Sequence, residues 1–309
     1  MRIGIGIGEA VGEGGSLDAL LKQFTKAEAD GFQAAWMANI FGLDAITTLA
    51  LAGRVTSTLE LGTFVVPTYP RHPTALAQQA LTASVASGGR FTLGIGLSHQ
   101  VVIENMFGLD YSKPIRHMRE YLSVLNPLLA GEAVRFQGKE FRIAAQVNVP
   151  GARKPDVVVA ALGPQMLALT GRMADGTATW MGSAQYLEKV AIPTISAAAR
   201  EAGRKAPRII SGFPIAVTAK VDAARESAAK TFAMYGQLPS SRATLDRGGA
   251  AGPADVAIVG SEAEVERQLR ALAAIGVTDL NASPFAVEGD DGVRDRTYAL
   301  LASLAKQGM

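Results

Sequence analysis

The sequence predicts an α/β protein in which all 309 residues form one closed (β/α)8 TIM barrel, with insertions after strands 4 and 7. Short apolar segments of strand length alternate with helical patterns along the whole chain. This alternation is typical of repeated βαβ units with a parallel sheet. We count eight strand segments, which is the number that closes a barrel of this type.

In the first half of the chain, the expected helices begin at residues that favour a helix start. Ser16 has a side chain that can cap a helix, and Pro73 stands where the first helical turn tolerates proline. Apolar residues at helical spacing form a stripe from Ile115 to Leu129. The predicted strands are residues 2–8, 34–38, 59–66 and 90–96, and the predicted helices are residues 16–31, 44–53, 73–87 and 114–130.

The second half repeats this alternation. Its last helix starts at a capping box, Ser261-Glu262-Ala263-Glu264, and ends at Gly276. Pro193 is expected to break an earlier helix. The predicted strands are residues 156–161, 176–181, 208–217 and 277–282, and the predicted helices before the last one are residues 165–174, 184–202 and 222–235.

Two segments do not fit the repeat and are predicted to be insertions. Residues 132–150 read as an extended segment with a hairpin around Gln137-Gly138. Residues 236–255 are too polar for a core and too long for an ordinary connection, which favours a lid or binding loop. Arg242 and Arg247 of this loop would then close over the cofactor, whereas a solvated basic loop is the alternative.

A doubly wound open sheet is the alternative architecture. It would need a glycine fingerprint directly after the first strand. Gly4, Gly6 and Gly8 instead alternate inside the predicted first strand. Small residues at alternate positions of a strand relieve crowding inside a barrel, so these glycines favour the closed form.

Composition excludes several classes of function. The 30 basic and 28 acidic residues give a net charge of +2 without a basic run, so nucleic acid is not an expected partner. The chain has no cysteine, and its three histidines are not spaced as metal ligands, so no metal site is expected. Because we find no signal peptide or membrane span, we expect a cytoplasmic protein with no membrane partner.

Barrel geometry places an active site at the carboxyl ends of the strands. The residues expected there include few acids and bases, which disfavours hydrolysis and metal-assisted chemistry. Such a rim suits a bound redox cofactor that supplies the reactive atom, while the protein contributes shape and a few hydrogen bonds. The apolar walls of a roomy substrate pocket are expected from Phe41, Phe64, Trp180, Met181 and Phe213.

The segment Ala160-Ala161-Leu162-Gly163-Pro164-Gln165 joins a predicted strand end to a helix start. Unpaired backbone N–H groups and the helix dipole can hold a phosphate there without any lysine. The segment is therefore a candidate for binding the phosphate of a cofactor. An ordinary connection with a proline in the first helical turn is the alternative.

The segment Gly94-Ile95-Gly96-Leu97-Ser98-His99 ends the fourth predicted strand. Its glycines permit a flat ring to approach closely, so cofactor contacts are expected from Gly96, Leu97 and Ser98. His99 can donate or relay a proton near neutral pH and is the candidate catalytic residue. A structural hydrogen-bonding role for a lone histidine is the alternative.

Three prolines stiffen the segment Pro67-Thr68-Tyr69-Pro70-Arg71-His72-Pro73 after the third strand and fix it beside the pocket. Arg71 and His72 are equally compatible with solvent exposure. His117 precedes an apolar position inside a predicted helix and is expected on the surface.

Together these segments resemble the luciferase-like monooxygenase superfamily over nearly the whole chain. Within it, they are most similar to the branch of oxidoreductases that use the deazaflavin coenzyme F-420. The resemblance rests on Leu61-Gly62-Thr63 with Pro67 and Arg71-His72-Pro73, on residues 94–99, on Met118-Arg119-Glu120-Tyr121-Leu122 with Pro127-Leu128-Leu129-Ala130-Gly131, and on residues 160–165.

The resemblance implies an enzyme that transfers a hydride between the deazaflavin and a small electron-poor organic substrate, with His99 supplying or accepting the companion proton. It implies a non-proline cis peptide between Phe64 and Val65 against the cofactor ring, and a ring contact from Asn39. It also implies a homodimer. Two alternatives stay open: an FMN-dependent monooxygenase that uses reduced flavin and dioxygen, and a flavin-binding barrel without turnover.

Overall fold

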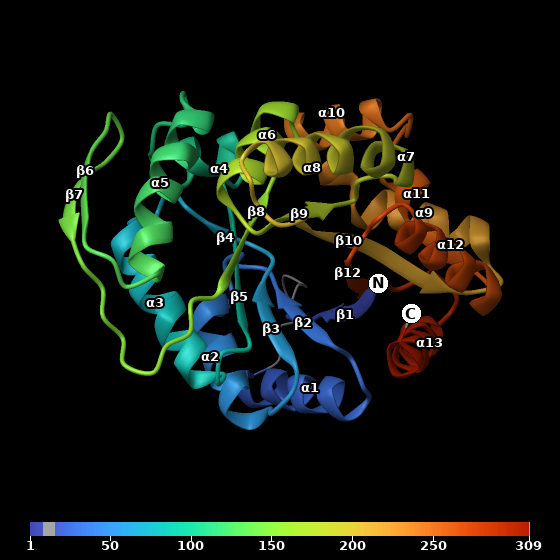
Figure 1. Ribbon diagram of the computed structural model, residues 1–309. Helices are drawn as coiled ribbons and strands as arrows, with labels where there is room; N and C mark the ends of the chain where they lie inside the picture. The colour runs from blue at the N-terminus through green and yellow to red at the C-terminus, as the bar shows by residue number, and fades with distance from the viewer. Residues whose placement is uncertain (9–15, 309) are drawn as a thin grey trace.

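Eight parallel strands close into a barrel in the computed structural model, which describes residues 1–8 and 16–308 (Figure 1). The order around the barrel is β1, β2, β3, β5, β8, β9, β10 and β12, and β12 pairs with β1. All of these neighbours are parallel, and Gly4 of β1 lies opposite Ala34 on one side and Asn281 on the other. The predicted barrel is confirmed, and the open sheet is excluded.

The barrel strands lie close to the predicted segments, except that the third is divided in two. The bounds are β1 Arg2–Gly6, β2 Ala34–Met37, β3 Glu60–Thr63, β4 Val66–Pro67, β5 Phe91–Gly96, β8 Asp156–Ala160, β9 Gly176–Trp180, β10 Arg208–Val217 and β12 Asp279–Pro284. A further short strand, β11 Ile258–Gly260, pairs with β10 and is absent from the sequence prediction.

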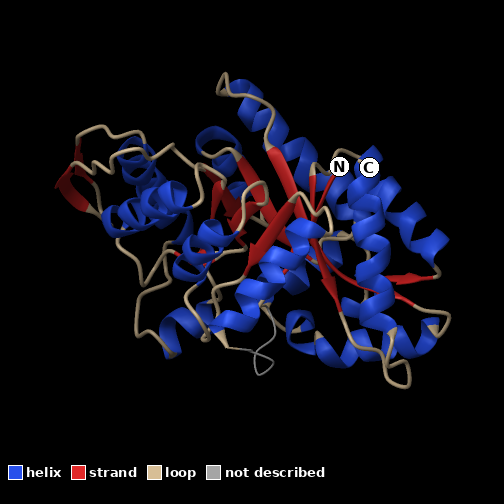
Figure 2. Ribbon diagram, turned by 90° about the horizontal axis from the view of Figure 1, so that it is seen from below, coloured by secondary structure: helices blue, strands red, loops and turns tan. Residues whose placement is uncertain are grey.

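Helices surround the strands (Figure 2), and several begin at the predicted residues. The Ser16 hydroxyl accepts a hydrogen bond from the Ala19 N–H at 3.3 Å, and the capping box of Ser261 and Glu264 is formed. The longer helices are α1 Leu17–Ala29, α2 Ala45–Val55, α3 Pro73–Ala86, α5 Pro114–Leu129, α6 Pro164–Met173, α8 Ile192–Glu201, α9 Val221–Thr231, α10 Pro239–Arg247, α12 Glu262–Ala274 and α13 Val293–Gln307.

Several short helical segments are absent from the prediction. They are α4 Gln100–Asn105, α7 Ala184–Tyr186, α11 Pro253–Val256, a π-helical turn at Leu187–Ala191 and a 3-10 turn at Ala233–Gly236. The expected break at Pro193 is wrong, because the π turn lets the chain continue into α8, where Pro193 occupies the first turn and needs no partner for its nitrogen. The sequence prediction also lacks α4 and α13. No helix in the described ranges is long and apolar enough to span a lipid bilayer.

The first insertion is the predicted hairpin, formed by β6 Val134–Gln137 and β7 Arg142–Ala145, which extends from the barrel at the left of Figure 1. Glu120 of α5 anchors its tip. The Glu120 carboxylate accepts hydrogen bonds from the backbone N–H groups of Lys139 and Glu140, at 2.9 and 2.7 Å. A Cβ on Gly138 would lie 2.1 Å from the same carboxylate, so the tip requires glycine there.

The second insertion is helical, so the prediction of a loop over residues 236–255 is wrong. It contains α10 and α11, and Leu245 packs with Met181 and Val256 in a small core. The guanidinium of Arg242 binds the carbonyls of Ala250 and Ala251 at 2.8 Å, which closes the end of α10 on itself. The polar residues of this insertion form hydrogen bonds within it, and the guanidinium of Arg242 is used in this way and not for binding a ligand.

Trp36 fills the middle of the barrel interior. It packs with inward-facing residues of β8, β9 and β10, whereas the alternate residues of each strand face the helices. A Cβ on Gly62 would lie 2.1 Å from the indole Cζ3, and a Cβ on Gly4 would lie 2.6 Å from the indole Nε1. The glycine at position 4 therefore relieves crowding, as predicted for the glycines of the first strand.

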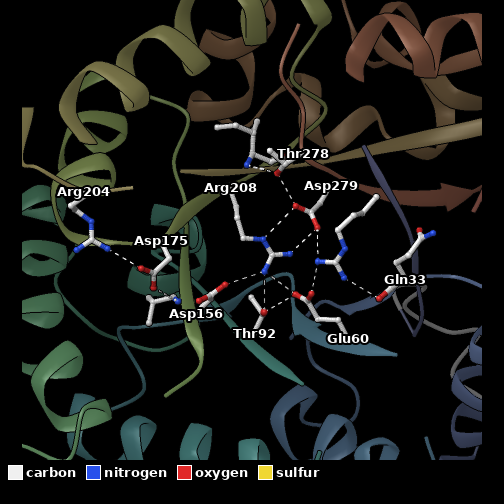
Figure 3. A network of polar contacts seen from close by, with 12 residues as sticks. Gln33, Glu60, Thr92, Asp156, Asp175, Arg204, Arg208, Thr278 and Asp279 are labelled. Carbon is white, nitrogen blue, oxygen red and sulfur yellow. Dashed lines mark hydrogen bonds and ion pairs between the residues drawn. The ribbon is translucent and has the colours of Figure 1, made fainter. Parts of the chain in front are cut away.

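Charged residues close the amino end of the barrel (Figure 3). We call Arg2, Glu60, Asp156, Arg208 and Asp279 the basal network. Arg208 donates hydrogen bonds to Glu60 at 2.9 Å and to Asp279 at 2.7 Å, and it also contacts Asp156 at 3.3 Å. Burial alone would raise the pKa of Glu60, but the charges of Arg208 and Arg2 outweigh burial and lower it. The basal network occupies the face that serves stability in barrels, opposite the mouth.

Candidate active site at the barrel mouth

The candidate site lies at the carboxyl ends of β3, β5 and β8, where the chain brings several predicted residues together. The peptide between Phe64 and Val65 is cis, which confirms the bond implied by the resemblance. It separates β3 from β4. Phe64 N–H donates to the Met37 carbonyl at 2.8 Å, and Asn39 N–H donates to the Val65 carbonyl at 3.4 Å. The end of β2 therefore supports this bulge through backbone hydrogen bonds.

The glycines of β5 make room for the bulge. A Cβ on Gly94 would lie 1.9 Å from the Thr63 carbonyl oxygen, and a Cβ on Gly96 would lie 2.7 Å from a Val65 methyl group. The same Cβ on Gly96 would lie 3.1 Å from the Ala160 side chain. The side chains of Val65 and Ala160 thus lie close to Gly96 inside the mouth. The missing side chains of Gly94 and Gly96 let the segment Thr63–Val65 lie close to β5.

Ser98 and His99 follow β5 at the mouth. Ser98 adopts a left-handed backbone conformation with φ of 60°, which is uncommon for a residue with a side chain and turns the chain into α4. Its carbonyl accepts a hydrogen bond from the Tyr111 hydroxyl at 3.3 Å. His99 occupies the N-cap position of α4 without capping it, and burial lowers the pKa of its imidazole. The lowered pKa favours the neutral form of the imidazole. Leu97 is partly buried and packs against the main core.

The predicted phosphate segment contains the end of β8 and the start of α6. Ala161 is fully buried and faces the helices, and the Leu162 carbonyl accepts a hydrogen bond from Tyr186 at 2.6 Å. Gly163 is the N-cap of α6, and no side chain caps this helix. A Cβ on Gly163 would meet no atom within 4 Å. Open space therefore adjoins Gly163, and the N–H groups of the first turn after Pro164 have no side-chain cap and can hold an anion.

Trp180 and Met181 stand at the end of β9, beneath the second insertion. The Trp180 ring lies 6.1 Å from Phe232 and 6.0 Å from Tyr235, and its Nε1 is buried without a hydrogen-bond partner among the described residues. Met181 has φ of 55°, and its N–H donates to the Gly212 carbonyl at 3.0 Å. The Trp180 Nε1 is therefore a buried donor at the end of β9 that no described residue satisfies.

One of the predicted pocket walls lies in the core, and another is exposed to solvent. Phe213 is 2% exposed and belongs to the core between the sheet and the helices, because the inward positions of β10 are those of Ile210 and Gly212. Its assignment to the pocket is wrong. Phe41 is 60% exposed, in the segment between β2 and α2, with its ring 6.1 Å from that of Phe107. Its assignment to the pocket stays a prediction.

Arg71 and His72 lie in the segment after β4, and the sequence left both compatible with exposure to solvent. Arg71 donates to Asp44 at 2.7 Å and to the Asn39 side-chain oxygen at 3.3 Å, and its side chain is only 18% exposed. The interpretation of Arg71 as solvent-facing is therefore wrong, because two polar partners from the segment after β2 hold it. His72 is exposed, as that interpretation expects, and its Nδ1 accepts the Thr74 N–H at 3.3 Å.

His117 is buried, so its predicted surface position is wrong. Its ring stacks on Tyr69 with centroids 3.9 Å apart, and its Nε2 forms a 3.0 Å hydrogen bond with the Thr68 hydroxyl. Burial lowers the pKa of His117 to about 4 although Glu140 and Glu120 act in the opposite direction. The signal available in the sequence was the spacing of four between His117 and Tyr121, which places both rings on one helix face.

Comparison with known proteins supplies independent information. The sequence pattern of the luciferase-like monooxygenase family matches residues 1–305. An uncharacterised protein of Mycobacterium tuberculosis is 30% identical over 237 residues, which cover 72% of this chain and 69% of that protein. The 5,10-methylenetetrahydromethanopterin reductase of Methanolobus tindarius is 28% identical over 278 residues, which cover 89% of this chain and 84% of that enzyme.

Two solved structures show the same fold at low sequence identity. The coenzyme F-420-dependent tetrahydromethanopterin reductase from Methanopyrus kandleri has a TM-score of 0.79 and 21% identity, and the match covers 98% of each chain. The oxygenating constituent of 3,6-diketocamphane monooxygenase from Pseudomonas putida, in complex with FMN, has a TM-score of 0.75 and 17% identity, and the match covers 99% of this chain and 97% of that one.

Proposed function

Because the chain belongs to the luciferase-like monooxygenase family, we propose that it is an oxidoreductase that passes a hydride between coenzyme F-420 and a small organic substrate. The observation that most supports this choice of cofactor is the similarity to methylenetetrahydromethanopterin reductase over most of both chains. The structural likeness to an F-420-dependent reductase agrees with it at the level of the fold.

The residues at the mouth fit a cofactor that has a planar ring and a phosphate group. Small residues, Gly96 and Ala160, stand beside the Phe64-Val65 bulge, where a flat ring would lie. The start of α6 offers uncapped N–H groups to a phosphate, with open space at Gly163. The buried Nε1 of Trp180 is a donor without a described partner. This set of donors suits a deazaflavin and also a flavin.

The side chains of the site have separable roles in this proposal. When bound, coenzyme F-420 supplies two-electron hydride chemistry. His99 holds or moves the companion proton at an imidazole nitrogen, and its depressed pKa keeps that nitrogen free to accept a proton from a substrate hydroxyl at neutral pH. Phe64 and Trp180 present apolar surface that excludes water and selects an apolar substrate.

Use of FMN is the second candidate, favoured by the family's monooxygenases and by the structural likeness to an FMN complex. The test is to add coenzyme F-420 or FMN to the purified protein and to measure binding by the change in cofactor fluorescence. We expect F-420 to bind more tightly. Tight binding of FMN with none of F-420 would reject the proposal in favour of the monooxygenase.

Replacing His99 with Ala tests the proton-transfer role. We expect turnover with any accepted substrate to fall by a factor of about 10² to 10⁴, while cofactor binding changes little. Unchanged turnover would remove the imidazole from the reaction. Absence of turnover in the wild-type protein despite tight cofactor binding would instead favour a barrel that binds the cofactor without reaction.

A homodimer is part of the proposal. Helices α2 and α3 pack side by side, and their outer surfaces expose Leu51, Val55 and Val85. Exposed apolar side chains gathered on neighbouring helices are typical of an interface between subunits. We therefore expect these two helices to meet the same helices of a second copy.

A further inference from the structure

Three aromatic rings stack on one another near the carboxyl end of β5, and we call Tyr69, Tyr111 and His117 the mouth stack. The Tyr69 ring lies in the middle, with its centroid 3.9 Å from that of His117 and 5.3 Å from that of Tyr111. The ring planes of these two pairs are 10° and 29° apart. The rings come from the segment after β4, the segment after α4 and α5 itself, so the mouth stack ties together three parts of the chain.

One end of the mouth stack is fixed to the barrel. The His117 Nε2 forms a 3.0 Å hydrogen bond with the Thr68 hydroxyl, and the Thr68 N–H donates to the Gly96 carbonyl of β5 at 2.9 Å. Phe141 of the hairpin packs against His117 with ring centroids 5.4 Å apart. Tyr69 therefore rests on a ring that hydrogen bonds and packing hold in place.

The other end of the mouth stack contacts the backbone beside the candidate catalytic histidine. The Tyr111 hydroxyl donates to the Ser98 carbonyl at 3.3 Å. Burial raises the pKa of Tyr111, so the hydroxyl keeps the proton that it donates. The Ser98 carbonyl belongs to the planar peptide that joins Ser98 to His99, and a hydrogen bond to its oxygen therefore also fixes the direction of the His99 N–H.

The turn at Ser98 needs support from its surroundings. Its φ of 60° lies in the left-handed region, which costs free energy for a residue with a side chain and persists only where other contacts compensate. The His99 carbonyl accepts hydrogen bonds from the Val102 and Ile103 N–H groups of α4, at 2.9 and 3.0 Å. The His99 imidazole forms no hydrogen bond with any other described residue, so its place depends on this backbone.

We propose that Tyr111 is a positioning residue that holds His99 at the mouth through the Ser98 carbonyl, with the other two rings of the mouth stack as its support. The inference rests on the proposed function, because it takes His99 as the residue that moves the proton. Tyr111 acts through Ser98 and needs no contact with the cofactor or the substrate. Tyr69 contributes its ring alone, since its hydroxyl is buried without a partner among the described residues.

The test compares three variants with the wild-type protein. Y111F removes the hydroxyl that binds Ser98, whereas Y69F removes a hydroxyl of the same stack that binds no described residue and is the matched control. Y69L removes the ring on which Tyr111 stacks. The first readout is an NMR titration of the three histidines, in which the His99 signal is identified by its loss in H99A. The second is turnover with any accepted substrate.

In the wild-type protein His99 should titrate below 6.5, because burial lowers its pKa. In Y111F and Y69L the turn should loosen and admit water to the imidazole, so the pKa of His99 should move toward 6.5. In both variants kcat should fall by about 3- to 10-fold, as expected for the loss of one hydrogen bond, while KM changes less. Y69F should behave like the wild-type protein in both readouts.

An unchanged His99 titration in Y111F, or an equal shift in Y69F, would overturn the positioning role whatever the turnover. A shifted titration with unchanged turnover would support the positioning role and remove His99 from the reaction, which is a failure of the proposed function alone. The NMR comparison needs neither cofactor nor substrate. Thermal unfolding shows whether each variant is folded, and the comparison of Y111F with Y69F decides the matter if Y69L is not.

Discussion

The substitution Gly62→Ala should show that the barrel interior is built around one indole. The added Cβ would lie 2.1 Å from Cζ3 and 2.4 Å from Cε3 of Trp36, whereas carbon atoms in contact are normally about 3.5–4.0 Å apart. The ring would have to move by about 1.4 Å to restore normal contact. The ring cannot move away easily, because the backbone of Gly4 also lies close to it: a Cβ built on Gly4 would be only 2.6 Å from the indole Nε1.

Crowding of this kind in a packed interior costs about 1–3 kcal/mol, and we expect the upper part of that range. The midpoint of thermal unfolding should fall by about 4–8 °C. The assay is urea and thermal unfolding of the wild-type protein, Gly62→Ala, Trp36→Phe and the double variant. In the double variant the smaller ring leaves room for the added methyl group, so the cost of Gly62→Ala should drop below about 0.5 kcal/mol.

Gly42→Ala is the control, because a Cβ at that position would meet nothing within 4 Å. Trp36→Phe removes no hydrogen bond within the described part of the chain, since the indole Nε1 has no partner there. The reasoning is refuted if Gly62→Ala unfolds like the control, or if its cost is the same with Phe at position 36 as with Trp.

Further predictions concern charge, protonation and assembly. Burial would raise the pKa of Glu28, but hydrogen bonds from the backbone N–H groups of residues 57–59 outweigh burial and lower the pKa from 4.5 to about 2. Glu28→Gln should therefore lower the free energy of unfolding by about 1–2 kcal/mol at pH 7. Urea titrations should show this difference between the variant and the wild-type protein shrinking as the pH falls from 4.5 toward 2. Arg208→Met should cost about 3–5 kcal/mol in the same assay by leaving the acids of the basal network uncompensated, and a loss below 1 kcal/mol would contradict their coupling. If His99 accepts the proton during substrate oxidation, activity should fall only below its depressed pKa and stay level through neutral pH, and His99→Gln should abolish that acid limb in a pH–rate profile. Sedimentation should show a dimer that Leu51→Lys with Val85→Lys converts to a monomer, and a monomeric wild-type protein would rule out this interface.

The repeating part of the fold could be predicted from the sequence because its signals are local. Ser16, Pro73 and the capping box at Ser261 each start a helix through groups within the same turn. The second insertion could not be predicted in this way. Its polar composition suggests a loop, and only the contact of Leu245 with Met181 explains why it folds as a helix against the barrel.

The candidate site was predictable where the strand ends determine it and unpredictable where packing between distant segments does. The cis bond at Phe64-Val65 could be inferred from the resemblance. The burial of His117 depends on Tyr69 and on Phe141 of the hairpin, neither of which is adjacent in sequence. Phe213 shows a different limit, because an error of one position along a strand exchanges the barrel interior for the helix layer.

The basal network has a consequence for how the protein is made. Its charges come from positions 2 to 279, and the closing seam joins β1 to β12. A ribosome therefore releases Arg2 and Glu60 long before the acid that completes their surroundings has been translated. A product that ends before β12 would lack Asp279 and would leave the edge of β1 unpaired, so the barrel can close only after nearly the whole chain has been made.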